Sequence, residues 1–324
     1  MKIDDFVYGE SEFKESILIS LVNSKPLQRL KGISQLGMPN EYYYKKGYSR
    51  YAHSLGVAIL LKKLGGTLKE QIAGLLHDIS HTAFSHVVDW VVGDPTKEDY
   101  QDNLYFNFVK NSEIPLILEK YGFYFKDFSK LEKFSLLEKN LPSLCADRID
   151  YTLREFVLDG RKNFVKEVLS NLEVKENQIV FLDKNIAEDF ARGYMDLQNN
   201  HWGGNQARAR YYILSNILKK ALKNKIISLN TLMETDQKVI SILEEKGDKF
   251  ILDNLNLLRN GLLVINYEKG IELKKKFRYL DPEVYYGKSI LNLSKISKEY
   301  GSFLENQKLK SKEIVKVKIF KNEN

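Results

Sequence analysis

Residues 72–89 read IAGLLHDISHTAFSHVVD, and three of the five histidines of the chain fall within this stretch. They are His77, His81 and His86, and Asp78 directly follows the first of them. The apolar residues before His77 have helical spacing, so the His-Asp pair is expected near the end of a helix. A neutral imidazole and a carboxylate are both good ligands for a divalent metal, and neighbouring residues can both bind one at a helix end. The stretch therefore predicts part of a metal site on a helical scaffold.

The remaining ligands must come from elsewhere in the chain. His53 is expected on an upstream helix, and Asp147 lies on an otherwise apolar helical face in the segment LCAD, residues 144–147. A buried carboxylate is costly unless it is paired or bound to a cation. A single histidine beside an apolar run is more often a packed core residue, but four histidines grouped with acidic residues favour a site. We therefore predict that His53, His77, Asp78 and Asp147 hold one divalent ion.

The sequence around these ligands predicts a mainly α fold. Apolar residues recur at helical spacing in 68–76, 144–158, 186–197 and 207–222, and a hairpin is expected from 172–174 and 179–181 around a turn at 175–178. After residue 229 we expect two shorter helices, N-capped by Asp236 and Asp248. Two β-like stretches follow, 262–279 (interrupted at Gly270) and 313–320. The predicted organisation is a helical domain over residues 1–228 with a lysine-rich α+β appendage, residues 229–324, packed on it.

The net charge of +7 is concentrated near the C-terminus. Residues 269–278 and 306–324 each carry an excess of four positive charges, so the remainder is close to neutral. We interpret both stretches as solvated strand faces, with an anion site or an allosteric nucleotide site as the alternative. The charge is not interleaved with aromatic residues in a nucleic-acid-binding motif, which disfavours a DNA- or RNA-binding protein.

Several features bear on the compartment. No apolar run reaches the ~18 residues that a membrane helix needs. Asp4 and Asp5 stand where a secretory signal would be apolar, and Cys145 is the single cysteine, which excludes a disulfide framework. We therefore expect a cytoplasmic protein without a membrane partner.

The motifs, taken in order, resemble the H…HD…D signature of the HD-domain metal-dependent phosphohydrolases. The resemblance is closest to the deoxynucleoside triphosphate triphosphohydrolase branch, which includes the sterile-alpha-motif-and-HD-domain enzymes. It is carried by residues 26–37 (PLQRLKGISQLG), 50–57 (RYAHSLGV), 77–89 and 147–151 (DRIDY), and runs from about residue 20 to 225. It implies an HD-domain helical bundle that hydrolyses a nucleotide, with a dNTP cleaved to deoxynucleoside and triphosphate as the leading hypothesis. It also implies a homo-oligomer, dimer or tetramer, and an activating nucleotide in many relatives.

The resemblance also implies roles for residues around the metal, which could be Zn, Fe, Mn, Ni, Co or Mg. His81 is the candidate acid or base, oriented by Asp89. His86 would donate a hydrogen bond to the same phosphate, although a packed core histidine is an equally simple interpretation. The predicted substrate-binding residues are Gln35, Leu36, Arg50, Gln101, Arg148, Tyr151 and Glu155. A packing or solvated role remains the alternative for Leu36 and Glu155.

One position departs from the family pattern. Many members have a His-Glu pair soon after the His-Asp loop, whereas this chain has Gln101 and Asp102 at the corresponding place. Glutamine can hydrogen-bond a phosphate but cannot transfer a proton near neutral pH. This difference motivates one alternative, a regulatory nucleotide-binding module with little turnover. A second alternative keeps the site and changes the substrate to nucleoside monophosphates or phosphodiesters.

Overall fold

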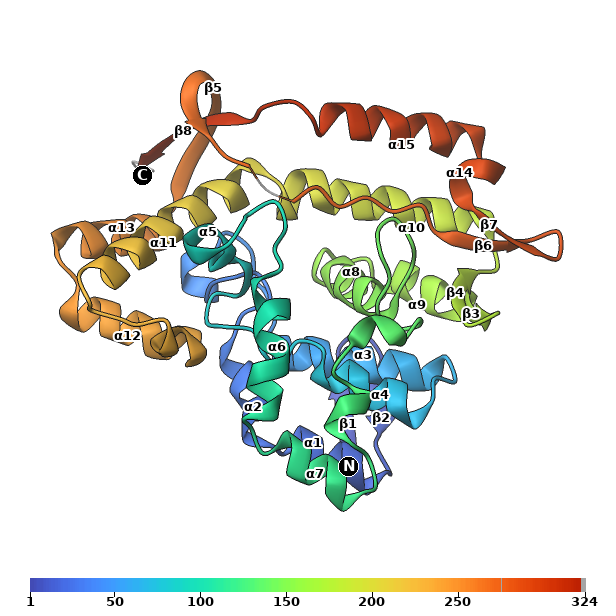
Figure 1. Ribbon diagram of the computed structural model, residues 1–324. Helices are drawn as coiled ribbons and strands as arrows, with labels where there is room; N and C mark the ends of the chain where they lie inside the picture. The colour runs from blue at the N-terminus through green and yellow to red at the C-terminus, as the bar shows by residue number, and fades with distance from the viewer. Residues whose placement is uncertain (275, 322–324) are drawn as a thin grey trace.

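The computed structural model describes residues 1–274 and 276–321, which form mainly α-helices with a small β part, as predicted (Figure 1). Lys275 and Glu323, which contribute to the lysine-rich stretches, lie outside the described residues. The helices, in chain order, are α1 (Ser16–Val22), α2 (Lys25–Arg29), α3 (Arg50–Lys63), α4 (Leu68–Leu76), α5 (Asp89–Val92), α6 (Tyr100–Lys110), α7 (Ile114–Lys120), α8 (Ala146–Leu158), α9 (Lys162–Asn171), α10 (Lys184–Leu197), α11 (Asn205–Lys223), α12 (Asp236–Lys246), α13 (Lys249–Asn260), α14 (Leu293–Ile296) and α15 (Lys298–Lys310).

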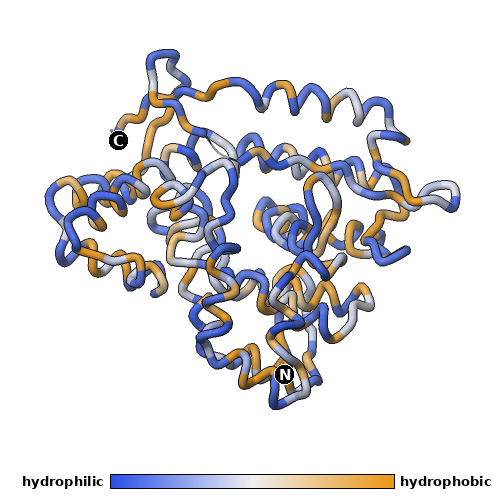
Figure 2. The backbone as a smooth tube through the Cα atoms, in the orientation of Figure 1, coloured by the Kyte–Doolittle hydropathy of each residue, from blue (hydrophilic) through white to orange (hydrophobic). Residues whose placement is uncertain are grey.

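The helices predicted from apolar periodicity are confirmed as α4, α8, α10 and α11. Helix α4 begins after Thr67, which forms a capping box with Glu70. Asp248 caps α13 as predicted, whereas Asp236 was wrongly predicted as a cap, because Thr235 accepts the capping hydrogen bond of α12. Many helices carry both hydrophobic and hydrophilic residues, as expected where one face of a helix packs against a core (Figure 2).

The strands form three small sheets. The predicted hairpin is present as β3 and β4, but its turn has only two residues, Glu176 and Asn177, both with positive φ. Strand β4 also pairs in parallel with β6, so the C-terminal part of the chain extends this sheet. Strand β5 ends at Glu272, so the strand predicted to residue 279 is too long. The strands are β1 (Lys2–Asp5), β2 (Gly9–Glu12), β3 (Leu172–Lys175), β4 (Gln178–Phe181), β5 (Leu262–Glu272), β6 (Glu283–Tyr286), β7 (Ser289–Asn292) and β8 (Lys316–Lys321).

Two hydrophobic cores hold these elements together. The first core is formed by α1, α3, α4, α8, α9 and α10. It also includes Leu280, Val284 and Tyr300 from the C-terminal part. The second packs α11 to α13 against residues 36–43 and 83–88. A domain boundary at residue 228 remains a proposal, and each core takes residues from both sides of it. None of the described helices is long and apolar enough to cross a membrane.

Asp236, the first residue of α12, fixes two segments that border the histidine-rich loop. Its carboxylate is buried and accepts hydrogen bonds from the backbone N–H of Ser34 (2.8 Å) and of Phe84 (2.7 Å). Phe84 has φ 64°, a left-handed conformation that is uncommon for a bulky residue. The loop that contains His81 and His86 therefore depends on a carboxylate from the C-terminal third of the chain.

We predict that Asp236→Ala lowers the free energy of unfolding by about 2–4 kcal/mol, because two backbone N–H groups lose their acceptor. Asp248→Ala is the matched control, since it removes an exposed cap from the next helix and should have a smaller effect. Urea unfolding of both variants measures the difference. An effect of Asp236→Ala no larger than that of Asp248→Ala would contradict this role.

Candidate active site

Two histidines from different helices face each other at the centre of the site. His53, on α3, is fully buried, and its Nδ1 lies 2.7 Å from Asp150 Oδ2. His77, just after α4, has its Nδ1 2.8 Å from the carbonyl oxygen of Gly74. Because a carbonyl and a carboxylate accept hydrogen bonds, both Nδ1 atoms carry the proton in the neutral rings. The two Nε2 atoms, 3.2 Å apart, then present lone pairs to each other.

Asp147, in the first turn of α8, completes a cluster that fits a cation. Its Oδ1 lies 2.9 Å from His53 Nε2 and 3.5 Å from His77 Nε2. Three facing lone-pair donors repel one another unless a positive charge lies between them, and ligands about 2.1 Å from one ion are themselves about 3.0–3.4 Å apart. Burial alone would lower the pKa of His77, but Asp78 and Asp147 raise it to about 10, so the surroundings favour positive charge at this point. The donor set therefore fits a divalent metal.

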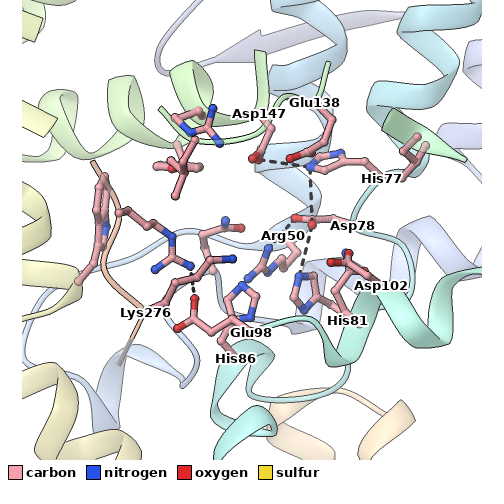
Figure 3. Close-up of a pocket in the computed structure, with 18 of the residues that line it drawn as sticks. Arg50, His77, Asp78, His81, His86, Glu98, Asp102, Glu138, Asp147 and Lys276 are labelled. Atoms are coloured by element: carbon pink, nitrogen blue, oxygen red, sulfur yellow. Dashed lines mark hydrogen bonds and ion pairs between the residues drawn. The ribbon is translucent and has the colours of Figure 1, made fainter. Parts of the chain in front are cut away.

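Asp78 lies at the edge of this cluster, between the histidines and Arg50 (Figure 3). Its Oδ1 is 3.6 Å from His77 Nε2, and its Oδ2 is 3.6 Å from His53 Nε2. Arg50 Nη1 donates to Oδ2 at 2.7 Å, and Arg50 Nε donates to the hydroxyl of Ser85. Although burial opposes it, Arg50 and the neighbouring histidines hold the pKa of Asp78 well below its usual value. Asp78 is therefore a carboxylate that can serve as the fourth ligand.

The predicted catalytic histidines have different partners from those expected. His81 Nε2 lies 3.3 Å from Asp78 Oδ1, whereas Asp89 Oδ2 lies 3.2 Å from His86 Nδ1. The expectation that Asp89 orients His81 is therefore wrong, because α5 directs Asp89 to the histidine one turn before it. Burial and the charge of Arg50 lower the pKa of His81 to about 3, so its ring is neutral near neutral pH.

A cavity of about 640 Å³ opens beside the cluster and is large enough for a nucleotide-sized ligand. His53 and Asp89 are buried, with exposed fractions of 0% and 2%. The other predicted site residues all line the cavity: Gln35, Leu36, Arg50, His77, Asp78, His81, His86, Gln101, Asp147, Arg148, Tyr151 and Glu155.

Several predicted substrate-binding groups are already hydrogen-bonded within the protein. The Arg148 guanidinium donates to the backbone carbonyls of Ser143 and Lys139. Gln101 accepts a hydrogen bond from the hydroxyl of Ser80 at 2.6 Å. By contrast, the Gln35 Oε1 atom is buried without a partner among the described residues. Substrate contact therefore requires no rearrangement at Gln35, whereas Arg148 would have to exchange its present partners.

At the aromatic part of the cavity, the Tyr151 hydroxyl lies 2.8 Å from that of Tyr194, and its ring packs edge-on against Trp202. Glu155 Oε2 lies 3.3 Å from Nε2 of the buried His201. Tyr151 and Trp202 thus give the cavity an aromatic wall, and Glu155 adds one buried carboxylate.

Sequence reasoning missed three groups of residues at the site. Asp150 was read only as part of a motif, although its position three residues after Asp147 on an apolar helix was a usable signal. Glu138 lines the cavity, and burial together with Asp147 raises its pKa to about 8. Lys276 and Arg278 also line it, which corrects the interpretation of residues 269–278 as a solvated strand face. Nothing in the local sequence places Glu138, Lys276 or Arg278 there.

Glu138, Cys145 and Asp147 form a second group whose donor atoms lie within 4.8 Å of one another. Burial raises the pKa of the Cys145 thiol to about 12, so it stays protonated and is a poor ligand. The group also shares Asp147 with the first cluster. It therefore does not fit a separate metal site.

We predict that Asp150→Asn weakens Mn²⁺ binding by about 10–100-fold, because a neutral amide removes the negative charge that makes His53 a stronger ligand and balances Arg154. Asp159→Asn, at the half-exposed end of the same helix, is the control and should bind like the wild type. Titration calorimetry on metal-stripped protein measures both. Equal affinities in the two variants would show that Asp150 does not fix the ligand geometry.

Comparison with known proteins gives consistent results. The HD-domain family profile matches residues 50–152, which include all four predicted metal ligands. The chain is 38% identical to the uncharacterised protein YdhJ of Bacillus subtilis over 99% of this chain and 100% of that protein. It is 35% identical to the metal-dependent phosphohydrolase cns2 of Cordyceps militaris, over 62% of this chain and 60% of that protein.

Two further similarities are more distant. The mouse deoxynucleoside triphosphate triphosphohydrolase SAMHD1 is 29% identical over 62% of this chain and 32% of its own length. A crystal structure of a phosphohydrolase from Bacteroides thetaiotaomicron shares the fold over 99% of this chain and all of that one, with a TM-score of 0.71 at 19% identity. With its HD profile, its full-length relative and a cluster of donors that fits a metal, this chain belongs to the HD-domain family of metal-dependent phosphohydrolases.

Proposed function

We propose that the protein hydrolyses a deoxynucleoside triphosphate to the deoxynucleoside and inorganic triphosphate, using one divalent ion per chain. The observation that carries this proposal is that His77, Asp78 and Asp147 line the same cavity, of about 640 Å³, as several cationic and aromatic residues. Arg50, Arg148, Lys276 and Arg278 supply positive charge, and Tyr43, Tyr48 and Trp202 supply surfaces for a nucleoside.

In this reaction the oxygen of a water molecule bonds to the α-phosphorus, and the bond from that phosphorus to the 5′ oxygen breaks. A divalent ion held by His53, His77, Asp78 and Asp147 would supply Lewis-acid stabilisation of phosphate charge and lower the pKa of a water molecule. In this proposal His81 takes a proton from the water and returns one to the 5′ oxygen. Arg50 stays oriented toward the phosphates by its bond to Asp78.

The choice of substrate is supported by the mouse relative, which is named a deoxynucleoside triphosphate triphosphohydrolase. Two cavity residues support a nucleotide substrate as well, because Gln35 and Glu155 offer buried acceptors for a sugar hydroxyl. Following the family resemblance, we also propose a homo-oligomer and an activating nucleotide.

Gln101 supports a second candidate, a nucleotide-binding module with little turnover. The residue lines the cavity and hydrogen-bonds Ser80, so it lies where a nucleotide would meet it but carries no transferable proton. This function would show as nucleotide binding without product release.

To test the proposal, purified protein is incubated with dNTPs, NTPs and monophosphates in the presence of Mn²⁺, Mg²⁺, Zn²⁺, Fe²⁺, Co²⁺ or Ni²⁺, and products are separated chromatographically. We predict deoxynucleoside and inorganic triphosphate in equal amounts from a dNTP. Asp78→Ala should reduce the product to background, because it removes a ligand and the partner of Arg50. Asp189→Ala, an exposed acidic residue on α10, is the control and should retain activity.

The other products separate the alternatives. Inorganic phosphate from monophosphates alone would assign a phosphomonoesterase. Binding of dNTPs with no triphosphate under any metal would assign the regulatory module. Equal activity in wild type and Asp78→Ala would show that the measured hydrolysis does not come from this site.

A further inference from the structure

The coil after β5 crosses the molecule to β6 (Figure 1), and two of its residues line the catalytic cavity. It is fixed at several points by segments far away in the sequence. Arg208 Nη1 donates to the carbonyl of Leu273 at 2.6 Å, and the backbone N–H of Lys276 donates to the carbonyl of Pro95 at 3.2 Å. Arg278 forms an ion pair with the buried Glu98. These hydrogen bonds and this ion pair fix the position of the coil.

Described residues of this coil border two different cavities. Lys276 and Arg278 line the catalytic cavity. Lys274 and Phe277 line a neighbouring cavity of about 470 Å³. The coil is thus a wall shared by both cavities, with Lys276 and Arg278 on the catalytic side.

Lys276 differs from the other cations of the catalytic cavity. Arg50 is paired with Asp78, and Arg278 is paired with Glu98. Within residues 1–274 and 276–321, the Lys276 ammonium has no hydrogen bond or salt bridge, although burial and the charge of Arg278 lower its pKa. A partly buried ammonium without a partner costs free energy, and a bound anion would remove that cost.

The surroundings of Lys276 keep this group available. Glu98, Asp102 and Glu138 lie close enough to favour its charged form. Figure 3 shows Lys276 and Glu98 on the side of the cavity away from His77 and Glu138. A phosphate chain that begins at the metal cluster and extends across the cavity would therefore approach this ammonium.

We propose that Lys276 is a substrate-binding residue whose ammonium holds the distal phosphates of a polyphosphate chain, and that the Glu98–Arg278 pair positions the coil that carries it. The proposal rests on the proposed function, since it places the same substrate in the same cavity. It makes the C-terminal part of the chain a component of the active site.

The test compares Lys276→Gln with Lys274→Gln, a matched control two residues away that faces the neighbouring cavity and is largely exposed. Titration calorimetry of the purified full-length protein with inorganic tripolyphosphate should show about tenfold weaker binding for Lys276→Gln, the loss of one charge-assisted hydrogen bond. Lys274→Gln should bind like the wild type, and Lys276→Arg should recover part of the affinity. In turnover of a dNTP, Lys276→Gln should raise KM about tenfold with kcat changed less than threefold.

Wild-type affinity in Lys276→Gln would overturn the proposal. So would an equal or larger loss in Lys274→Gln, because that would reflect general charge or binding in the neighbouring cavity. The binding measurement can be read even if no nucleotide is hydrolysed, so failure of the proposed function is distinguishable. Conversely, if the protein hydrolyses a dNTP but Lys276→Gln binds tripolyphosphate like the wild type, the proposed role of Lys276 is wrong and the proposed hydrolysis stands.

Discussion

The buried carboxylate of Asp150 is the interaction on which the site depends. Its Oδ2 accepts hydrogen bonds from His53 Nδ1 and from Arg154 Nε, both at 2.7 Å, and Arg154 in turn pairs with Asp5 at the N-terminus. Burying such charges costs several kcal/mol per ion, so the network is stable only while every partner is present. In return it fixes the tautomer of His53, which then offers an unprotonated Nε2 to the other ligands. The first residues of the chain, α3 and α8 are thereby tied to the chemistry of the metal cluster.

This network also explains a glycine in the middle of α3. A Cβ atom on Gly56 would lie 2.0 Å from Arg154 Nη2 and 2.1 Å from Asp150 Oδ1. Glycine costs about 1 kcal/mol relative to alanine inside a helix, but here only its missing side chain allows α3 and α8 to approach. The same turn of α3 carries His53, so close packing and ligand position are set together.

The sequence predicted much of the fold and the ligand set because both depend on local patterns. Apolar periodicity located α4, α8, α10 and α11. The histidine and aspartate motifs predicted that His53, His77 and Asp147 share one site, and their donor atoms do lie close together. Which distant side chains contact each other could not be predicted in the same way. That Asp89 faces His86, or that Lys276 reaches the cavity, depends on how distant segments cross in space. A lysine-rich stretch looks the same in sequence whether its side chains meet solvent or a substrate.

We propose that His53, His77, Asp78 and Asp147 together hold one divalent ion. Equilibrium dialysis of the purified protein against Mn²⁺, followed by elemental analysis, tests it most directly when wild type is compared with a folded His77→Ala variant. We expect one ion per chain in the wild type and loss of that ion in the variant. A wild-type protein that binds no ion, or a His77→Ala variant that retains a full equivalent, would contradict it.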